Sequence, residues 1–344
     1  MKPISLAMPE TTPGIRVLRS KGELFRQALV ELGAFDRSRK ISSDGKYVDL
    51  PVLPMEEQAA AKLRCRGDFD RVEMEFEPEQ KRPSPEDLLG YKPSYEVIGD
   101  IAIVEDEGAE QVAQALLDAC KSIKTVLLPV SEVEGEFRLR RFRHIAGEDG
   151  TTTLHKENGL LYQVDLEGVY FTARLANERL RVARGVRPSE VVLDMFAGVG
   201  PFSLLLAKRG ACVIAVDKNP LAIKYLRQNA ALNRIEEVTI LEGDAAELAL
   251  QFEGQADHVV MNLPHSSSQF LIPGLRATRN GGTVHYYTIA PEDALYQDEG
   301  LIQRAADQLG FSVEMIFRGI VRSYAPRRYN VVMDFRVWRA PPTQ

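Results

Sequence analysis

The chain has 344 residues, 44% of them hydrophobic and 27% charged, and a formal net charge of −6 at pH 7. A chain of this length is expected to divide into two or three domains, and its composition is that of an ordinary globular protein. No apolar run approaches the roughly 20 residues that span a bilayer, which argues against a membrane protein. Three widely separated cysteines suggest neither a disulfide framework nor a zinc site, so we expect a cytoplasmic protein.

The first 85 residues are predicted to form a small α/β domain and its linker. Lys21–Leu32 has helical spacing, and Lys46–Val52 alternates like a strand. The paired prolines of Lys81–Pro85 are incompatible with both helix and strand pairing. This last stretch is therefore predicted to be the linker.

A second α/β domain is expected at residues 86–166. Tyr95–Val104 is predicted to be a strand pair broken at Gly99-Asp100, Gly108–Ser122 an amphipathic helix, and Thr125–Val130 a further strand. Residues 134–165 are polar and rich in turn residues, and they contain the basic cluster Arg138–His144.

The third domain, residues 167–344, contains the most informative segment, Val191–Phe202. Three apolar residues lead into Asp194 and the turn Gly198-Val199-Gly200, and a helical pattern follows. This order of strand, glycine turn and helix predicts the first βα unit of a Rossmann-like sheet. Ordinary α/β proteins also contain such turns, so the segment alone does not identify a ligand.

Three further strands bring a polar residue to the same edge of the predicted sheet. Asp217 follows the strand Cys212–Val216, Asp244 follows a third strand, and Asn262 follows His258–Met261. Open α/β sheets bind ligands at the carboxyl ends of their strands, which predicts a cofactor site here. The alternative is that the acids only cap helices.

Two cofactors compete for this edge, a dinucleotide and S-adenosylmethionine. A dinucleotide seats its pyrophosphate on a helix N-terminus, but Ser203 replaces the third glycine of that fingerprint and Pro201 removes a backbone donor. S-adenosylmethionine has no phosphate and is favoured. Asp217, 19 residues after Gly198, is then placed to accept hydrogen bonds from ribose hydroxyls.

The tripeptide Asn262-Leu263-Pro264 ends the fourth strand. Proline fixes an extended turn, which would leave the amide of Asn262 facing the cleft, where its donors and acceptors can read the edge of a base. The alternative is a simple strand terminator.

At these residues the chain resembles the archaeal and eukaryotic tRNA (guanine-N1)-methyltransferases that modify the guanosine 3′ of the anticodon. The resemblance covers nearly the whole chain, and its motifs are specific in combination. Those motifs are Val133–Arg138, Ala146–Glu148, His155–Gly159, Val169–Phe171, Arg174-Leu175, Glu178-Arg179, Asp194–Phe202, Asn262–Pro264, His285–Tyr287 and Ser323–Arg327. One departure is Ala173, where the family usually has proline.

The resemblance implies an N-terminal module that reads the tRNA body, a middle RNA-facing domain, and a class I methyltransferase domain with a seven-stranded sheet. It implies S-adenosylmethionine as the methyl donor, and tRNA, through its body and anticodon stem-loop, as the partner of a monomeric chain. The residues implied for the cofactor are Asp194, Phe196, Ala197, Gly198, Gly200, Asp217, Lys218, Asp244, Asn262 and Arg179.

N1 of guanine carries a proton that methylation must remove, and a carboxylate is a natural general base. The resemblance assigns this role to Glu178; the alternative is a helix acid paired with Arg179 or Arg181. Arg138 is predicted to stabilise the charge that develops on O6, with a phosphate contact as the alternative.

The target base must leave the anticodon stack, which favours an aromatic neighbour. Tyr170 is assigned this contact, with core packing as the alternative. Asn262 and Pro264 are expected to orient the guanine edge. Candidate phosphate contacts are Arg322, Arg327 and Arg328.

Four other functions remain open to different degrees. The chain could also methylate a wyosine precursor, or could be the related aminocarboxypropyl transferase, which Asn262–Pro264 with Glu178 disfavours. It could be a non-catalytic tRNA-binding protein, which the acidic cofactor edge disfavours, or a DNA amino-methyltransferase, in which Glu178 would have no proton to remove. No metal is predicted, because the five histidines have no Cys or carboxylate at ligand spacing.

Overall fold

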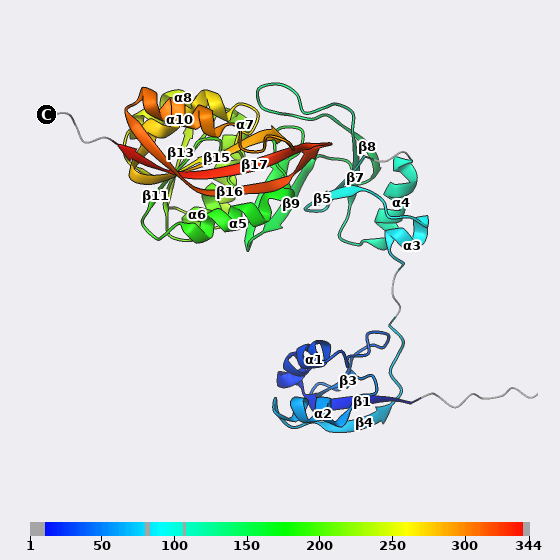
Figure 1. The fold of residues 1–344 in the computed structure, drawn as a ribbon. Helices are drawn as coiled ribbons and strands as arrows, with labels where there is room; N and C mark the ends of the chain where they lie inside the picture. Colours follow the sequence, from blue (N-terminus) through cyan, green and yellow to red (C-terminus); the bar gives the residue numbers. More distant parts are fainter. Residues whose placement is uncertain (1–10, 80–82, 106–107, 340–344) are drawn as a thin grey trace, which may run out of the picture. The chain divides into compact units, whose positions relative to one another are not determined.

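A computed structural model describes residues 11–79, 83–105 and 108–339. The chain forms two compact units, Met1–Pro83 and Ser84–Gln344, each visible in Figure 1. The finer boundary expected after residue 166 falls inside the second unit and stays a prediction.

The first unit is an antiparallel sheet in the order β2-β3-β1-β4 with two helices. Its core joins Phe25 and Leu29 of the first helix to Ile15 and Val17 of the central strand. The helix and strand predicted here are confirmed as α1 and β3. The elements are β1 (Thr12–Leu18), α1 (Gly22–Glu31), β2 (Ser42–Ser43), β3 (Tyr47–Pro51), α2 (Glu57–Arg64) and β4 (Asp70–Met74), with the 3-10 turn η1 (Arg19–Lys21).

The second unit begins with a four-stranded sheet in the order β5-β6-β7-β8. Val112 and Leu116 of its longer helix pack on Ala102 and Val126 of the sheet. The predicted strand pair, helix and strand are confirmed as β5–β6, α4 and β7. The elements are α3 (Pro85–Leu89), β5 (Tyr95–Ile98), β6 (Ile101–Val104), α4 (Ala109–Ala119), β7 (Thr125–Pro129) and β8 (Phe142–Gly147).

Residues 134–165, for which the sequence indicated only a polar stretch rich in turns, also contain strands. Besides β8, this stretch forms a hairpin of β9 (Thr152–Glu157) and β10 (Leu160–Asp165). Its turn is Asn158-Gly159, and both residues have positive φ, 50° and 77°. Asn-Gly is the dipeptide that two-residue hairpin turns prefer, so the signal was in the sequence.

Two sets of contacts hold this hairpin between its neighbours. On one side the backbone N–H of Gly99, in the β5–β6 turn, donates to Nδ1 of His155 at 3.1 Å. On the other side the amides of Asn229 and Asn233 each donate to and accept from the backbone of β10. The hairpin therefore links the small sheet to the helix α7 (Pro220–Leu232), which packs on the large one.

The large sheet has seven strands in the order β13-β12-β11-β14-β15-β17-β16, as the fold class predicts. It is parallel from β13 to β15, and β17 is antiparallel to both its neighbours. The strands are β11 (Val191–Asp194), β12 (Cys212–Asp217), β13 (Val238–Glu242), β14 (Ala256–Met261), β15 (Thr278–Pro291), β16 (Phe311–Ala325) and β17 (Arg328–Arg339).

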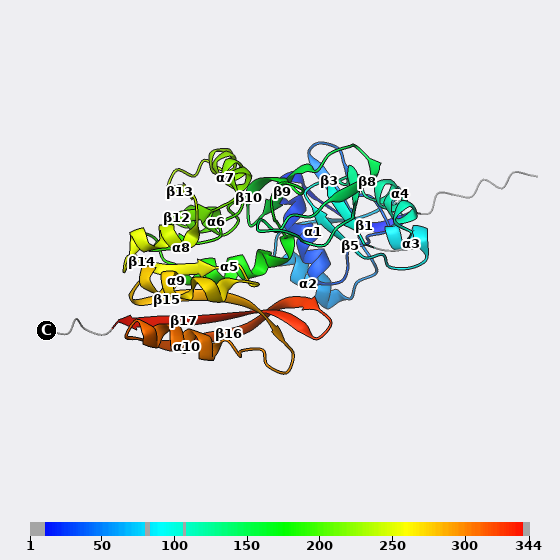
Figure 2. The same cartoon turned by 90° about the horizontal axis from the view of Figure 1, so that it is seen from above.

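Helices cover both faces of this sheet, with α5 and α6 on one side and α8 and α10 on the other (Figures 1 and 2). Buried side chains form a separate core on each face. The helices are α5 (Ala176–Gly185), α6 (Ser203–Lys208), α7 (Pro220–Leu232), α8 (Ala245–Leu248), α9 (Leu271–Ala277) and α10 (Glu299–Gln308), with the 3-10 turns η2 (Ala173–Leu175), η3 (Ala249–Phe252) and η4 (Ser267–Phe270). Within the described residues, no helix is long and apolar enough to cross a membrane.

The chain order creates a switch point beside β11. From β11 it runs outward to β12 and β13, then returns to place β14 on the other side of β11. In such sheets the crevice at the carboxyl ends next to the switch point is where ligands bind.

Candidate active site

A cavity opens at this edge, with walls from the segments that follow β11, β12, β13 and β14 and from the turn before α5. The predicted cofactor residues that line it are Phe196, Ala197, Gly198, Asp217, Lys218, Asp244, Asn262 and Arg179. The predicted catalytic residues that line it are Arg138, Tyr170, Asn262 and Pro264. Asp194, Gly200 and Glu178 are not among its lining residues.

Gly198 leaves free space in the wall of the cavity. Its φ of 55° favours glycine, and a Cβ built there would have only the carbonyl oxygen of Tyr170 within 4 Å, at 3.8 Å. The Gly198 N–H donates to Oδ2 of Asp217 at 2.7 Å, which fixes the turn against β12. A ligand can therefore approach the backbone of this turn closely.

The carboxylate of Asp217 is half-buried at the end of β12. Besides Gly198, the backbone N–H of Asn219 donates to Oδ1 at 2.9 Å. Burial raises the pKa of this carboxyl group, against the effect of those N–H donors. Each oxygen retains a lone pair for a further donor, an arrangement that fits a pair of ribose hydroxyls.

Asp244 has two roles in the structure. Its Oδ1 accepts from the backbone N–H of Ala246 at 2.8 Å and so caps α8, while Oδ2 lies 3.6 Å from Nζ of Lys218. Lys218 Nζ is bonded more closely to Glu136, at 2.6 Å. Asp244 therefore caps a helix, which was the alternative role for these acids, and it still lines the cavity.

The rest of this end of the cavity is apolar. Phe196 and Phe270 meet edge to face with ring centroids 4.8 Å apart, and Ala222 and Ala245 complete the wall. Acids for hydroxyl and amino groups beside a flat apolar slot fit the adenosine part of S-adenosylmethionine. The lining residues are thus chemically suited to this cofactor.

Two of the predicted cofactor residues lie behind the cavity wall. Asp194 is 1% exposed and accepts from Oγ of Ser203 at 2.6 Å; burial raises its pKa to about 6. Gly200 faces α7, where an added Cβ would lie 2.2 Å from Cδ1 of Leu226. Both residues shape the glycine turn, and their contact with a cofactor stays a prediction.

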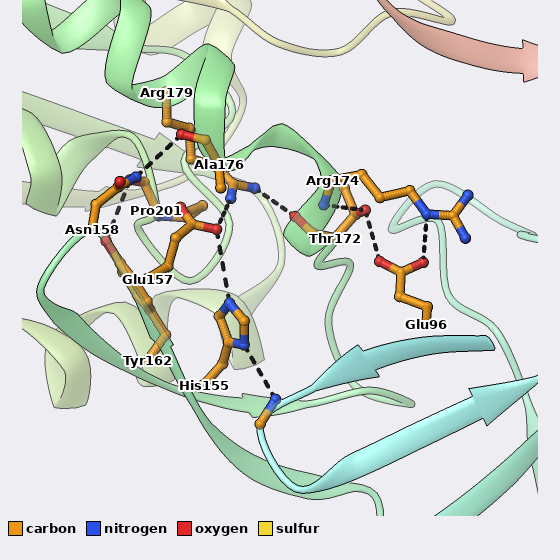
Figure 3. A network of polar contacts seen from close by, with 11 residues as sticks. Glu96, His155, Glu157, Asn158, Tyr162, Thr172, Arg174, Ala176, Arg179 and Pro201 are labelled. Carbon is orange, nitrogen blue, oxygen red and sulfur yellow. Dashed lines mark hydrogen bonds and ion pairs between the residues drawn. The ribbon is translucent and has the colours of Figure 1, made fainter. Parts of the chain in front are cut away.

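Arg179 lines the cavity but is already bonded within the protein (Figure 3). Its guanidinium donates to Oε2 of Glu157 at 2.6 Å and to the carbonyl oxygen of Thr172 at 2.9 Å. Burial opposes ionisation of Glu157, yet His155 and Arg179 keep the pKa of that carboxyl group below its usual range. Arg179 therefore ties the cavity wall to the β9–β10 hairpin.

The same network reaches the small sheet through Glu96. Its carboxylate accepts from Oγ1 of Thr172 at 3.2 Å and pairs with Nε of Arg174 at 2.9 Å, as Figure 3 shows. Thr172 also caps η2. The turn that carries Tyr170 is thereby anchored even though Ala173 replaces the usual proline.

Arg138 and Tyr170, predicted separately, are brought together at the outer end of the cavity. The guanidinium carbon of Arg138 lies 5.0 Å from the ring centroid of Tyr170. Arg138 has a φ of 57° in a turn closed by its N–H to the carbonyl of Gly135. Tyr170 is 37% exposed, so core packing, the alternative for this residue, does not apply.

Glu178 lies outside the cavity, in the first turn of α5. Arg181 donates to both its oxygens, at 2.9 and 2.7 Å, and the hydroxyl of Tyr287 donates to Oε1 at 2.6 Å. Of the two arginines considered as partners, Arg181 is the one bonded to it. Its role as a base stays a prediction, and the role requires these bonds to loosen.

Beyond Arg181 the polar contacts continue away from the cavity. Arg181 also donates to Asp334 at 2.6 Å, and Asp334 Oδ1 lies 2.9 Å from Nδ1 of His285. His285 is stacked on His258, whose Nε2 is 3.2 Å from Glu190. These groups line a second, polar cavity under the sheet.

The mouth of the active-site cavity carries positive charge. His265 lies edge-on to Tyr324 with ring centroids 5.2 Å apart. Burial, and after it the positive charges of Arg138, Arg328 and Arg322 in that order, lower the pKa of His265 to about 4. Two of the predicted phosphate contacts, Arg322 and Arg328, therefore lie close to His265.

Sequence reasoning missed several lining residues. Thr172, Asn219 and Phe270 follow recognised segments and could have been found by extending the motifs. Asn330 is different: it lies inside a strand, is 2% exposed, and falls outside the motif Ser323–Arg327 and the candidate contact Arg328 that precede it. Among the described residues there is no group of three or more potential metal ligands.

Profiles of three known domains match consecutive parts of the chain. The tRNA methyltransferase 5 N-terminal domain matches residues 14–60, the TYW2 N-terminal domain residues 81–150, and the TRM5/TYW2 methyltransferase domain residues 153–314.

Whole-length relatives decide the family. The chain is 40% identical, over 95% of its length and 99% of the relative's, to the tRNA (guanine(37)-N(1))-methyltransferase Trm5b of Pyrococcus abyssi. The crystal structure of that Trm5b is 39% identical over the same shares of both chains and superposes with a TM-score of 0.68. The chain belongs to the Trm5 family.

Two further relatives bear on the substrate. A complex of aTrm5 with tRNALeu is 33% identical over 94% of this chain and 99% of that one, with a TM-score of 0.66. A tRNA(Phe) (4-demethylwyosine(37)-C(7)) aminocarboxypropyltransferase of Methanocaldococcus jannaschii is 32% identical, over 71% of this chain and 98% of its own. The Trm5 relatives thus match a larger part of the chain, including its first unit.

Proposed function

We propose that this protein transfers the methyl group of S-adenosylmethionine to N1 of the guanosine at position 37 of tRNA. The observation that carries this proposal is the 40% identity to a Trm5b over 95% of the chain and 99% of the relative. The class I sheet and the chemistry of the cavity at its switch point support it.

The cofactor belongs at the end of the cavity nearest the glycine turn. When bound, S-adenosylmethionine supplies an electrophilic methyl group on a sulfonium centre. Asp217 accepts from its ribose and Asp244 from its adenine amine, while Gly198 leaves room for close backbone approach. Phe196 and Phe270 exclude water from the apolar side.

The target guanine belongs at the other end, between Tyr170, Arg138 and Asn262. Tyr170 offers an exposed aromatic face to a base that has left the anticodon stack. Asn262 and the turn at Pro264 orient the edge of the base towards the cofactor. Arg138 donates to O6, where negative charge collects as N1 loses its proton.

The carboxylate of Glu178 would take the ring proton from N1. The freed N1 lone pair would then bond to the methyl carbon as the bond from that carbon to the sulfonium sulfur breaks, leaving the neutral thioether S-adenosylhomocysteine. For this transfer, Glu178 must exchange a bond to Arg181 or Tyr287 for the base. Because α5 follows directly from the turn that carries Tyr170, seating of the base can be coupled to that exchange. Removing the proton in this way contributes about 10²–10⁴-fold to the rate.

The tRNA partner is held by charge around the cavity mouth. Arg322 and Arg328 lie near His265, and we assign them, with Arg327, to backbone phosphates of the anticodon loop. The first unit, whose profile match is to the Trm5 N-terminal domain, is assigned to the tRNA body. We take the protein to act as a monomer in the cytoplasm.

The experiment that tests the function compares two unmodified tRNA transcripts that differ only at position 37. With labelled S-adenosylmethionine, the transcript with G37 should acquire label and the transcript with A37 should not. Cofactor binding without label on either transcript would contradict the proposal and favour a tRNA-binding protein.

Aminocarboxypropyl transfer is the second candidate, because a transferase of that class matches 71% of the chain. It uses a different carbon of the same cofactor, so the two reactions leave different masses on the tRNA. When the cofactor is labelled in its methyl group, label on the tRNA together with a mass increase of one methyl group supports the first candidate. Transfer to a wyosine precursor is tested in the same assay with pre-modified tRNA.

A further inference from the structure

Unpaired polar atoms gather around the outer end of the cavity. Within the described residues, eight buried side-chain nitrogen or oxygen atoms have no hydrogen-bond partner, besides Nδ1 of His285, which pairs with Asp334. Three of them, Nε of Arg138, Nε of Arg322 and Oδ1 of Asn330, belong to residues at or beside the mouth of the cavity. Buried groups of this kind are rare in folded proteins and call for a partner.

Asn330 is the most telling of the three. It lies on β17, in register with Ile289 on one side and Arg322 on the other. The N–H of Ile289 donates to the carbonyl of Pro264 at 3.2 Å, which places Asn330 one strand away from the Asn262–Pro264 turn. Asn330 itself is 2% exposed and lines the cavity.

A structural role does not explain this amide. None of the hydrogen bonds in the described residues involves its side chain, although a buried amide oxygen left unpaired is strongly disfavoured. An apolar residue of similar size would fill the same space at no such cost. Oδ1 is itself buried from solvent, so a ligand that brings its own hydrogen-bond donor can reach it once the amide turns towards the cavity that the residue lines.

The chemistry of the target base indicates which donor that is. N1 of guanine is flanked by O6 on one side and by the exocyclic 2-amino group on the other. O6 is assigned to Arg138, and N1 must stay free for the base and the methyl group. Asn262, which orients the edge of the base, can accept from one hydrogen of the 2-amino group, and the other hydrogen still lacks an acceptor.

We propose that Asn330 is a specificity-determining residue whose Oδ1 accepts a hydrogen bond from the 2-amino group of the target guanine. This inference rests on the proposed function, because it presumes that a guanine occupies the outer end of the cavity. Together with Arg138 at O6, it would make the site read both flanks of N1. A purine that lacks the 2-amino group would leave the amide unpaired.

Inosine provides the matched substrate, since it keeps O6 and the N1 proton and lacks only the 2-amino group. We would measure kcat/KM for transcripts with guanosine or inosine at position 37, using the full chain and its Asn330→Ala and Asn330→Asp variants. The native protein should prefer guanosine by about tenfold, the effect of one buried hydrogen bond.

Asn330→Ala should lose activity on the guanosine transcript and lose little on the inosine transcript. The ratio of the two kcat/KM values should therefore fall towards one. Asn330→Asp keeps the acceptor and should keep the preference. Asn280→Ala, at an exposed position on β15 outside the cavity, is the matched control and should keep it as well.

Two results would overturn the proposal: a native protein that treats both substrates alike, or an Asn330→Ala variant that loses activity equally on both. The second would assign Asn330 a structural role. If Asn330→Ala does not fold, the ratio of kcat/KM for guanosine and inosine in the native protein and in Asn330→Asp still tests the proposal. Failure of the proposed function would look different, because the native protein would then methylate neither transcript.

Discussion

Arg181 pairs with Glu178 and Asp334 at the same time. Two of its nitrogens donate to the carboxylate of Glu178, and its other terminal nitrogen donates to the carboxylate of Asp334. One guanidinium thus divides its charge between a residue of α5 and a residue of β17. Because Glu178 is the proposed base, the strength of this hold sets how readily the carboxylate can turn to a substrate.

Replacing Glu178 by glutamine should lower the rate of methyl transfer by at least about 10²-fold, since the amide cannot take the N1 proton. Glutamine retains the size of the side chain and can still accept from Tyr287. Single-turnover methylation of a G37 transcript measures the loss, and equilibrium binding of the cofactor and of the tRNA serves as the control. Unchanged chemistry in Glu178→Gln would exclude the residue as the base.

Asp334→Asn should tighten the remaining pair between Arg181 and Glu178. In the native protein Asp334 is ionised, because His285 and Arg181 lower the pKa of that carboxyl group although burial opposes this. Without its charge, Arg181 interacts more strongly with Glu178 and releases it less readily. We expect slower single-turnover methylation with unchanged binding of the cofactor and of the tRNA. A native rate in Asp334→Asn would mean that Asp334 does not act on Glu178 through Arg181.

Substitutions of Asp217 and Asp194 should differ in their effects: the first should lower the affinity for the cofactor, and the second should act on the stability of the fold. Asp217→Asn weakens the acceptor that faces the cavity, so the Kd for S-adenosylmethionine should rise about 10-fold or more. Asp194→Asn should change affinity little, because Asp194 is buried against Ser203. Titration calorimetry and thermal melts of both variants measure the two effects. If both variants lost the same affinity for S-adenosylmethionine, Asp194 would belong to the cofactor site after all.

Four strand ends of the methyltransferase fold could be predicted from short-range patterns. Val191–Asp194 and the strands that lead to Asp217 and Asn262 are apolar runs that stop at a polar residue, and a parallel sheet needs nothing more to align them. The side on which each polar group lies could not be predicted. Asp194 and Gly200 share the motif with Gly198, but only Gly198 faces the cavity.

Long-range contacts account for what the sequence did not reveal. Asn330 reaches the cavity because the antiparallel β17 lies next to β15, and that pairing joins segments about 40 residues apart. Glu178 is paired with Arg181 and Tyr287 rather than exposed, which depends on α5 packing over the sheet. The β9–β10 hairpin was missed for another reason: its Asn158-Gly159 turn lies in a polar stretch with weak apolar alternation.

The buried His258 should make folding stability depend on pH. Burial, and after it the charge of His285, lower its pKa to about 4. Because the folded pKa is below the unfolded value of 6.5, the unfolded chain binds more protons between pH 4 and 6.5. Stability is therefore complete above pH 6.5 and is lost as the pH falls, by about 2 kcal/mol at pH 5.

His258→Gln removes this titration, so its Tm should fall less than that of the native protein between pH 7 and pH 5. Asp194, whose pKa is raised to about 6, has the opposite slope, but it is present in both proteins and cancels in the comparison. Parallel Tm curves for the two proteins would show that His258 is not held neutral in the fold.

The most direct test of the account locates the transferred group on the tRNA. An unmodified G37 transcript is incubated with the protein and S-adenosylmethionine, digested with a base-specific nuclease, and its fragments are analysed by mass and by nucleoside chromatography. We predict one methyl group, at position 37, recovered as 1-methylguanosine. A methyl group on the exocyclic nitrogen, a product at another position, or an aminocarboxypropyl adduct would contradict the account.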